Sequence, residues 1–108
     1  MININGEDWE ILLVSPNYPL LLMPNGKYAI GACDDPLKVI AINEELNNHY
    51  LKKVLCHELT HASMYSYNID LTYAQEELLA DITATYGSEI IEMTNKIFKT
   101  IKQKMGEY

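Results

Sequence analysis

The spacing of apolar residues changes halfway along the chain, and this change restricts the folds that the chain can adopt. Before residue 43 the apolar residues form short runs, separated by turn-forming segments such as Pro-Asn-Gly at 24–26. After residue 47 they recur every third or fourth position, which is the period of an amphipathic helix. A chain that begins with strands and ends with helices is expected to adopt an α+β fold.

Four apolar runs in the first half are predicted to be strands. They occupy residues 9–15, 20–23, 27–33 and 37–42. The segments between them, Pro-Asn-Tyr-Pro, Pro-Asn-Gly and Asp-Asp-Pro, are typical of turns. Short runs joined by tight turns predict a small antiparallel meander of three or four strands.

Two helices are predicted in the second half, at about residues 47–67 and 73–105. The break between them contains Asp70 and Thr72, either of which can cap the second helix. Gly87 interrupts the second pattern and predicts a kink or a close approach of another helix, at a cost of about 1 kcal/mol relative to alanine. Lysines crowd the end of this helix, where the helix dipole favours positive charge, and we interpret them as a solvated helix end: Lys96, Lys99, Lys102 and Lys104.

Size and charge limit the functional classes. The chain has 108 residues, so we expect a single domain over residues 1–108. A formal net charge of -7 makes nucleic acid and anionic membranes poor partners. Cys33 and Cys56 are far apart and form no Cys-x-x-Cys pair, which favours two thiols in a reducing compartment. With no signal peptide and no apolar run of about 18 residues, the sequence predicts a soluble cytoplasmic protein.

The first predicted helix carries a His-Glu-x-x-His pattern, formed by His57, Glu58 and His61. Residues four apart lie about one turn apart on nearly the same helix face, so both imidazoles can reach one metal ion. Neutral imidazole is a good ligand for Zn²⁺. Glu58, one residue after the first histidine, can act as a general base beside the metal without being a ligand.

A catalytic zinc site normally has three protein ligands, so a third is needed. The metzincin pattern is excluded because Met64 and Tyr67 stand where that pattern has glycine and histidine. His49 lies two turns before His57 on the same helix, which is too far along the axis for both to bind one ion. Carboxylates on the second helix are therefore the better candidates.

The segment Glu-Glu-Leu-Leu-Ala-Asp at residues 76–81 supplies these carboxylates. Glu77 and Asp81 are four residues apart and share a helix face, and the small Ala80 permits close helix packing. We predict that Glu77 is the third zinc ligand and that Asp81 accepts the free ring N–H of a ligating histidine, which would fix its tautomer. Glu76 lies on a different face and is expected to be exposed.

Residues 57–81 resemble the gluzincin zinc metallopeptidases, whose second helix carries Glu-x-x-(Ala/Ser)-Asp. The preceding segment, YAIGACDDPLKVIAINEEL and then VLCHELTHA, is similar to the compact ImmA/IrrE-like peptidases of phages, plasmids and mobile elements. The resemblance implies a minimal zincin-like domain with the same zinc ligands, general base and hydrogen-bond partner, namely His57, His61 and Glu77, then Glu58, then Asp81.

The chain departs from the thermolysin-like members of this group in two respects. It is far shorter, and it has no histidine after residue 61 to stabilise the tetrahedral intermediate. A tyrosine is the candidate for this task; Tyr65, Tyr67 and Tyr73 are near in sequence, and we select Tyr73 as the oxyanion stabiliser. The resemblance also implies a repressor-type regulator as a partner.

The sequence therefore predicts a zinc-dependent peptidase acting on a protein or peptide substrate. If residues 37–42 lie at the sheet edge, an extended substrate can pair with them by β-augmentation. Two alternatives stay open at this point. One is a zinc-stabilised module of a mobile element that binds a partner strand without cutting it, and the other is a metal-free domain whose histidines belong to the core.

Overall fold

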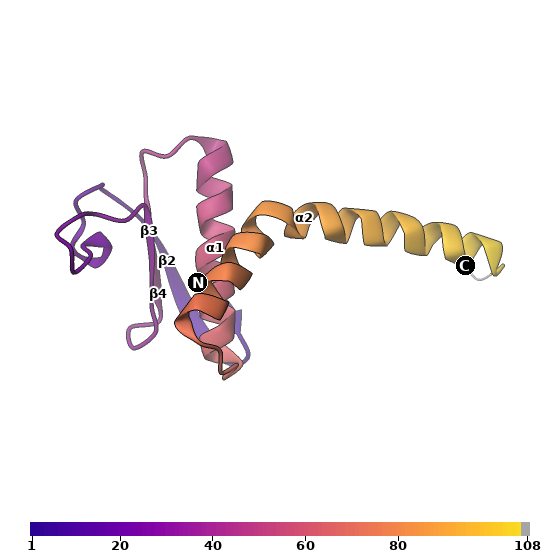
Figure 1. The fold of residues 1–108 in the computed structure, drawn as a ribbon, viewed down its shortest axis with the longest axis horizontal. Coiled ribbons are helices and arrows are strands. Elements are labelled where there is room, and N and C mark those ends of the chain that lie inside the picture. The colour runs from indigo at the N-terminus through magenta and orange to yellow at the C-terminus, as the bar shows by residue number, and fades with distance from the viewer. Residues whose placement is uncertain (107–108) are drawn as a thin grey trace.

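The computed structural model describes residues 1–106 and has the predicted α+β class, a sheet followed by two helices (Figure 1). The elements in chain order are β1 (Ile2–Ile4), β2 (Glu7–Val14), the 3-10 helix η1 (Pro19–Leu21), β3 (Gly31–Asp34), β4 (Val39–Asn43), α1 (Asn48–Ser66) and α2 (Tyr73–Lys104). Helix α1 packs on the sheet, and the first turns of α2 pack on α1.

The sheet is mixed, with the strand order β1-β2-β4-β3. The pairs β1/β2 and β3/β4 are antiparallel, but β2 and β4 are parallel, with Ile11 opposite Ile40. The prediction of a purely antiparallel meander is therefore wrong, although the number of strands agrees. The chain leaves β2, passes through η1, forms β3 at the far edge and returns to insert β4 in the middle.

Strand β4 lies inside the sheet because it is buried on both faces. Its residues Ile40 and Ile42 join Trp9 and Val54 in the core between the sheet and α1. Its residue Ala41 packs on the other face, in a second cluster with Val14 and Leu21. A continuous apolar run is typical of a strand that is covered on both faces. The segment 37–42 consequently does not form the sheet edge, and β3 takes that position.

The first 25 residues differ from the prediction in two places. Residues 20–23 do not form a strand, because Pro19 begins η1, and only Leu22 forms an isolated bridge, to Tyr28. Strand β1 was not predicted, although its turn carries a strong signal. Asn5 and Gly6 both have positive φ, 49° and 84°, as the Asn-Gly pair of a two-residue hairpin does.

Both helices begin at a residue whose side chain caps the first turn. The side chain of Asn47 accepts a hydrogen bond from the backbone N–H of Tyr50 at the start of α1. Thr72, and not Asp70, caps α2, in a reciprocal capping box with Gln75. At Gly87, α2 continues without interruption, and a Cβ there would meet only Cγ2 of Thr83 in the same helix, at 3.4 Å. The close approach of another helix predicted at Gly87 is therefore not observed within residues 1–106.

Helix α2 is much longer than the body of the protein requires. Its 32 residues correspond to about 48 Å of helix. The second half extends away from the sheet and from α1 (Figure 1). Neither α2 nor any other helix within residues 1–106 combines the length and apolar character needed to cross a membrane.

Candidate metal centre

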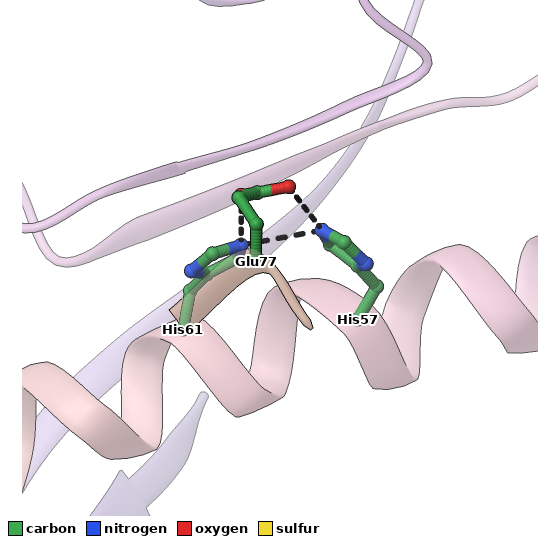
Figure 2. Close-up of side chains that lie close together, drawn as sticks. All are labelled: His57, His61 and Glu77. Carbon is green, nitrogen blue, oxygen red and sulfur yellow. Dashed lines mark hydrogen bonds and ion pairs between the residues drawn. The ribbon is translucent and has the colours of Figure 1, made fainter. Parts of the chain in front are cut away.

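Two imidazole rings on helix α1 point toward each other. His57 and His61 are four residues apart, and their Nε2 atoms are 3.2 Å apart (Figure 2). The helix is held on the sheet beneath them by Ala62, which is fully buried, and by Trp9, whose Nε1–H donates to Oγ of Ser66 at 2.8 Å. The His-Glu-x-x-His segment therefore lies between the sheet and α2 on a fixed helix.

Helix α2 brings Glu77 to the same point. The Oε1 atom of Glu77 lies 2.8 Å from Nε2 of His61, and its Oε2 atom lies 3.7 Å from Nε2 of His57 (Figure 2). The two helices approach closely here because Ala80, one turn after Glu77, is fully buried at their contact. The predicted ligand set His57, His61 and Glu77 is thus brought together, with its ligand atoms within 4.8 Å of one another.

Each histidine has a second carboxylate on its other ring nitrogen. Nδ1 of His57 lies 3.0 Å from Oδ1 of Asp81, which is the contact predicted for Asp81. Nδ1 of His61 lies 2.6 Å from Oε1 of Glu76. The side chain of Asp81 is 68% exposed, whereas that of Glu76 is only 14% exposed.

The expectation that Glu76 is exposed is therefore wrong. Glu76 and Glu77 are adjacent, so their side chains leave α2 about 100° apart. Because the first turn of α2 lies across α1 at His61, both side chains reach the same imidazole, one at each ring nitrogen. The sequence signal that could have identified Glu76 is its place in the first helical turn, where the capping box fixes the helix start.

The hydrogen bonds decide which ring atoms are free to bind a cation. A neutral imidazole that donates Nδ1–H to a carboxylate presents Nε2 as an acceptor. Both Nε2 atoms then face each other and the Glu77 carboxylate. When both imidazoles are neutral and donate their Nδ1–H, three acceptors face one another with no hydrogen between them, and a cation at their centre removes the resulting repulsion.

The donor set can hold a metal ion, and its composition is compatible with zinc. Two imidazoles and one carboxylate are a common protein ligand set for catalytic Zn²⁺. Two nitrogens at about 2.0–2.1 Å from a tetrahedral zinc are roughly 3.3 Å apart. The observed Nε2–Nε2 separation of 3.2 Å agrees with this value. His49 lies elsewhere, with its ring against Tyr50, so it does not belong to the cluster.

Glu58 is buried beside the ligands and is only 7% exposed. Burial raises the pKa of its carboxyl above the ordinary value of 4.5; the nearby His57 and His61 act in the opposite direction, and Glu77 adds to the rise. A carboxyl with a raised pKa is a better proton acceptor when it ionises than an exposed one.

Strand β3 forms the other wall of the site, a feature that the sequence patterns did not reveal. A Cβ on Gly31 would lie 2.6 Å from Cγ1 of Val54 and 3.1 Å from Oε2 of Glu58, so only glycine permits this contact. Cys33, two residues along β3, is near the same carboxylate. Burial, and then the charge of Glu58, raise the pKa of its thiol to about 12, so the thiol is protonated.

Two hollows meet at Glu58, one lined in part by His57 and the other in part by His61 and Glu77. The first, of about 290 Å³, is lined by Ile30, Tyr50, Val54 and Ala84 and reaches His57. The second, of about 400 Å³, is lined by Cys33, Tyr65, Tyr73, Glu76 and Glu77. Glu58 borders both. Gly31 of β3 lines the first hollow and Cys33 of β3 lines the second, so this strand borders both.

The three tyrosines considered as oxyanion stabilisers do not share one environment. Tyr73 and Tyr65 both line the second hollow, with Tyr73 82% exposed and Tyr65 39% exposed. Burial, and then the charge of Glu76, raise the pKa of the Tyr65 hydroxyl above 10.0, so this group keeps its proton. Tyr67 is 56% exposed and lines neither hollow.

No model of a protein family, no curated protein and no solved structure matches this chain.

Proposed function

We propose that the chain is a zinc-dependent peptidase that cleaves an extended segment of a protein, with Glu58 as general base. The observation that supports this most directly is the convergence of His57, His61 and Glu77 next to a buried carboxylate that borders two hollows. Zinc bound by these three residues would supply a Lewis acid and lower the pKa of a water molecule there towards about 7.

The residues of the chain have distinct tasks in this proposal. Glu76 and Asp81 hold the imidazole tautomers, so that both Nε2 atoms face inward. Glu58 accepts a proton from the attacking water and passes it to the leaving amine. A tyrosine hydroxyl of the second hollow, Tyr73 or Tyr65, donates a hydrogen bond to the developing oxyanion.

The substrate is held by the sheet edge. Strand β3 pairs with β4 on one side and is the last strand of the sheet on the other. An extended peptide can add to it as a further strand, with main-chain hydrogen bonds for affinity and the two hollows for side-chain selection. A repressor-type regulator in the cytoplasm is the substrate that the ImmA/IrrE resemblance suggests. The two free cysteines agree with a reducing compartment.

The test compares the wild type with Glu58→Gln, each loaded with one equivalent of zinc and incubated with a library of unstructured peptides. We expect mass spectrometry to show peptide cleavage by the wild type and a loss of about 10²–10⁴-fold in the variant. Zinc binding, measured by calorimetry, should be retained because Glu58 is not a ligand. The matched control is Glu44→Gln, at an exposed glutamate on the loop after β4.

Two results would contradict the proposal. If Glu58→Gln cleaves peptides at the wild-type rate, Glu58 is not the base. If the wild type binds zinc and peptides but cuts none of them, a zinc-stabilised binding module is the better description.

A further inference from the structure

The second half of α2, residues 86–104, lies outside the body of the protein (Figure 1). The Cα radius of gyration is 16.8 Å, whereas a compact chain of this length has about 13 Å. The principal extents of 58 × 31 × 28 Å show the same elongation. The projecting half therefore has no cover from the remainder of residues 1–106.

This projecting half nevertheless carries an apolar face. Tyr86, Ile90, Met93, Ile97 and Ile101 follow one another at spacings of four, three, four and four, which places them in one row. Their side chains are between 48% and 60% exposed. In an amphipathic helix such a row is normally buried against another element.

A second row lies beside the first and continues the face that packs on α1. This row begins at Ala80, which is fully buried against α1, and passes through Ala84 and Gly87. Beyond Gly87 it continues with Ile91, Phe98 and Met105, which are 57–61% exposed. The face that α1 covers in the first turns of α2 is thus left uncovered in the later turns.

The two rows together expose an area of the size that protein interfaces bury. If each of the eight large apolar side chains leaves roughly 100 Å² uncovered, the two rows expose about 800 Å², of which the five side chains of the first row supply about 500 Å². A standard protein interface buries about 800 Å² on each partner.

The charges along the projecting half indicate the occupant. Glu89 and Glu92 lie in its first part, and lysines 96, 99, 102 and 104 lie in its second part. Two such helices side by side and parallel would gather all their lysines at one end. Placed antiparallel, the acidic part of each helix lies beside the basic part of the other. The segment is complementary to a second copy of itself.

We propose that two copies of this chain associate through antiparallel pairing of α2. In the register that aligns the first row with itself, Ile90 of one copy packs on Met93 of the other, and Tyr86 packs on Ile97. In an antiparallel pair of helices with heptad spacing, residues at equivalent positions beside the apolar seam of the two copies face each other. Glu89, just before Ile90, and Lys96, three residues after Met93, occupy equivalent positions. Glu89 of each copy then lies beside Lys96 of the other, which gives two symmetric ion pairs.

This association is independent of the proposed peptidase activity. The centre of the pairing lies about 14 residues after Glu77, which is roughly 21 Å along the helix. Each candidate metal centre therefore stays on its own body, at opposite ends of the pair. A monomer that cleaves peptides would contradict the dimer alone, and a dimer that cleaves none would contradict the peptidase function alone.

The test is the molar mass of the 108-residue chain, measured by sedimentation equilibrium over about a hundredfold range of concentration. We expect twice the 12.4 kDa of one chain, with dissociation on dilution.

Glu89→Lys and Lys96→Glu should each weaken the dimer at least about tenfold, because each places like charges together twice. The double variant should recover most of the affinity. Lys99→Glu, on the opposite side of the helix, is the matched control and should dissociate like the wild type.

Folding of each variant can be followed separately. Trp9 is the only tryptophan and is fully buried in the body, so its fluorescence reports on the core and not on α2. Ile90→Asp should give a monomer with unchanged Trp9 emission. A wild type that stays monomeric at every concentration would overturn the proposal. A dimer that the charge exchange fails to restore would overturn the antiparallel register.

Discussion

At the scale of residues, the hydrogen bonds behind the two histidines matter as much as the ligand atoms themselves. His61 is held between Glu76 at Nδ1 and Glu77 at Nε2, at 2.6 and 2.8 Å. His57 makes the equivalent Nδ1 contact with Asp81 at 3.0 Å, but Asp81 is far more exposed. A hydrogen bond to a charged group is stronger when water is excluded. The contact of Glu76 with His61 should therefore contribute more to metal affinity than the contact of Asp81 with His57.

Glu76→Ala should lower zinc affinity about 10–100-fold, as loss of a hydrogen-bond partner of a metal ligand usually does. Asp81→Ala should lower it less, because water can replace a carboxylate that is 68% exposed. Competition with a fluorescent zinc chelator measures both affinities. Equal losses in the two variants would contradict the assignment of the stronger contact to Glu76.

Glu58→Gln should stabilise the metal-free protein. The pKa of Glu58 is raised in the folded state by burial, so the folded protein disfavours the carboxylate relative to the unfolded chain. This destabilisation is small below pH 4.5, grows as the pH rises from 4.5 to the folded-state pKa, and stays constant above that value. Above that pH, glutamine should increase the free energy of unfolding by on the order of 1 kcal/mol.

Urea unfolding of the metal-free wild type and of Glu58→Gln, at several pH values, measures this difference. The gap in unfolding free energy should open as the pH rises and close towards pH 4.5. A gap of the opposite sign would show that the histidines more than compensate for the burial of the carboxylate.

At the scale of elements, the contact between β3 and α1 depends on a single missing methyl group. Gly31→Ala would place its Cβ 2.6 Å from Cγ1 of Val54 and 3.1 Å from the Glu58 carboxylate. We expect a loss of about 1–3 kcal/mol in unfolding free energy, as for other overpacked sites. Calorimetry of thermal unfolding provides the measurement.

Two matched variants separate overpacking from other effects of alanine. Val54→Ala removes the Cγ1 that the new methyl would meet, so Gly31→Ala should cost less in that background. Gly87→Ala, on the uncovered part of α2, should stabilise the protein by up to about 1 kcal/mol, because a Cβ there meets only Thr83 at 3.4 Å. A Gly31→Ala variant as stable as the wild type would mean that α1 and β3 can separate without cost.

At the scale of the whole molecule, the candidate metal centre joins α1 to α2. The ligands come from both helices, so a metal that binds them stabilises the folded arrangement and not the unfolded chain. At a free zinc concentration 100 times the dissociation constant, the gain is about 2.7 kcal/mol. Zinc should therefore raise the thermal midpoint, and a chelator should reverse the effect.

His61→Ala should abolish this zinc-dependent shift in the thermal midpoint, because it removes a candidate ligand whose side chain is only 9% exposed. The matched control is His49→Ala, on the same helix but outside the cluster, which should retain the full shift. A shift of equal size in both variants would place zinc elsewhere on the chain.

Local sequence determined the helices and the residues that their faces bring together. Caps at Asn47 and Thr72 mark the helix starts, because a cap needs only its own neighbours. Spacings of four residues likewise placed His57 with His61, and Glu77 with Asp81, on common faces. The α+β class followed from the change of apolar period alone.

Tertiary structure decided what depends on contacts between distant segments. The parallel pairing of β2 with β4 follows from burial of β4 on both faces, which its run of apolar residues permits but does not require. The contact of Glu76 with His61 depends on where α2 crosses α1, and the contact of Gly31 with Glu58 depends on the packing of β3 against α1. Helical period and capping act within a few residues, whereas the choice of strand neighbours and helix crossings is made by the core as a whole.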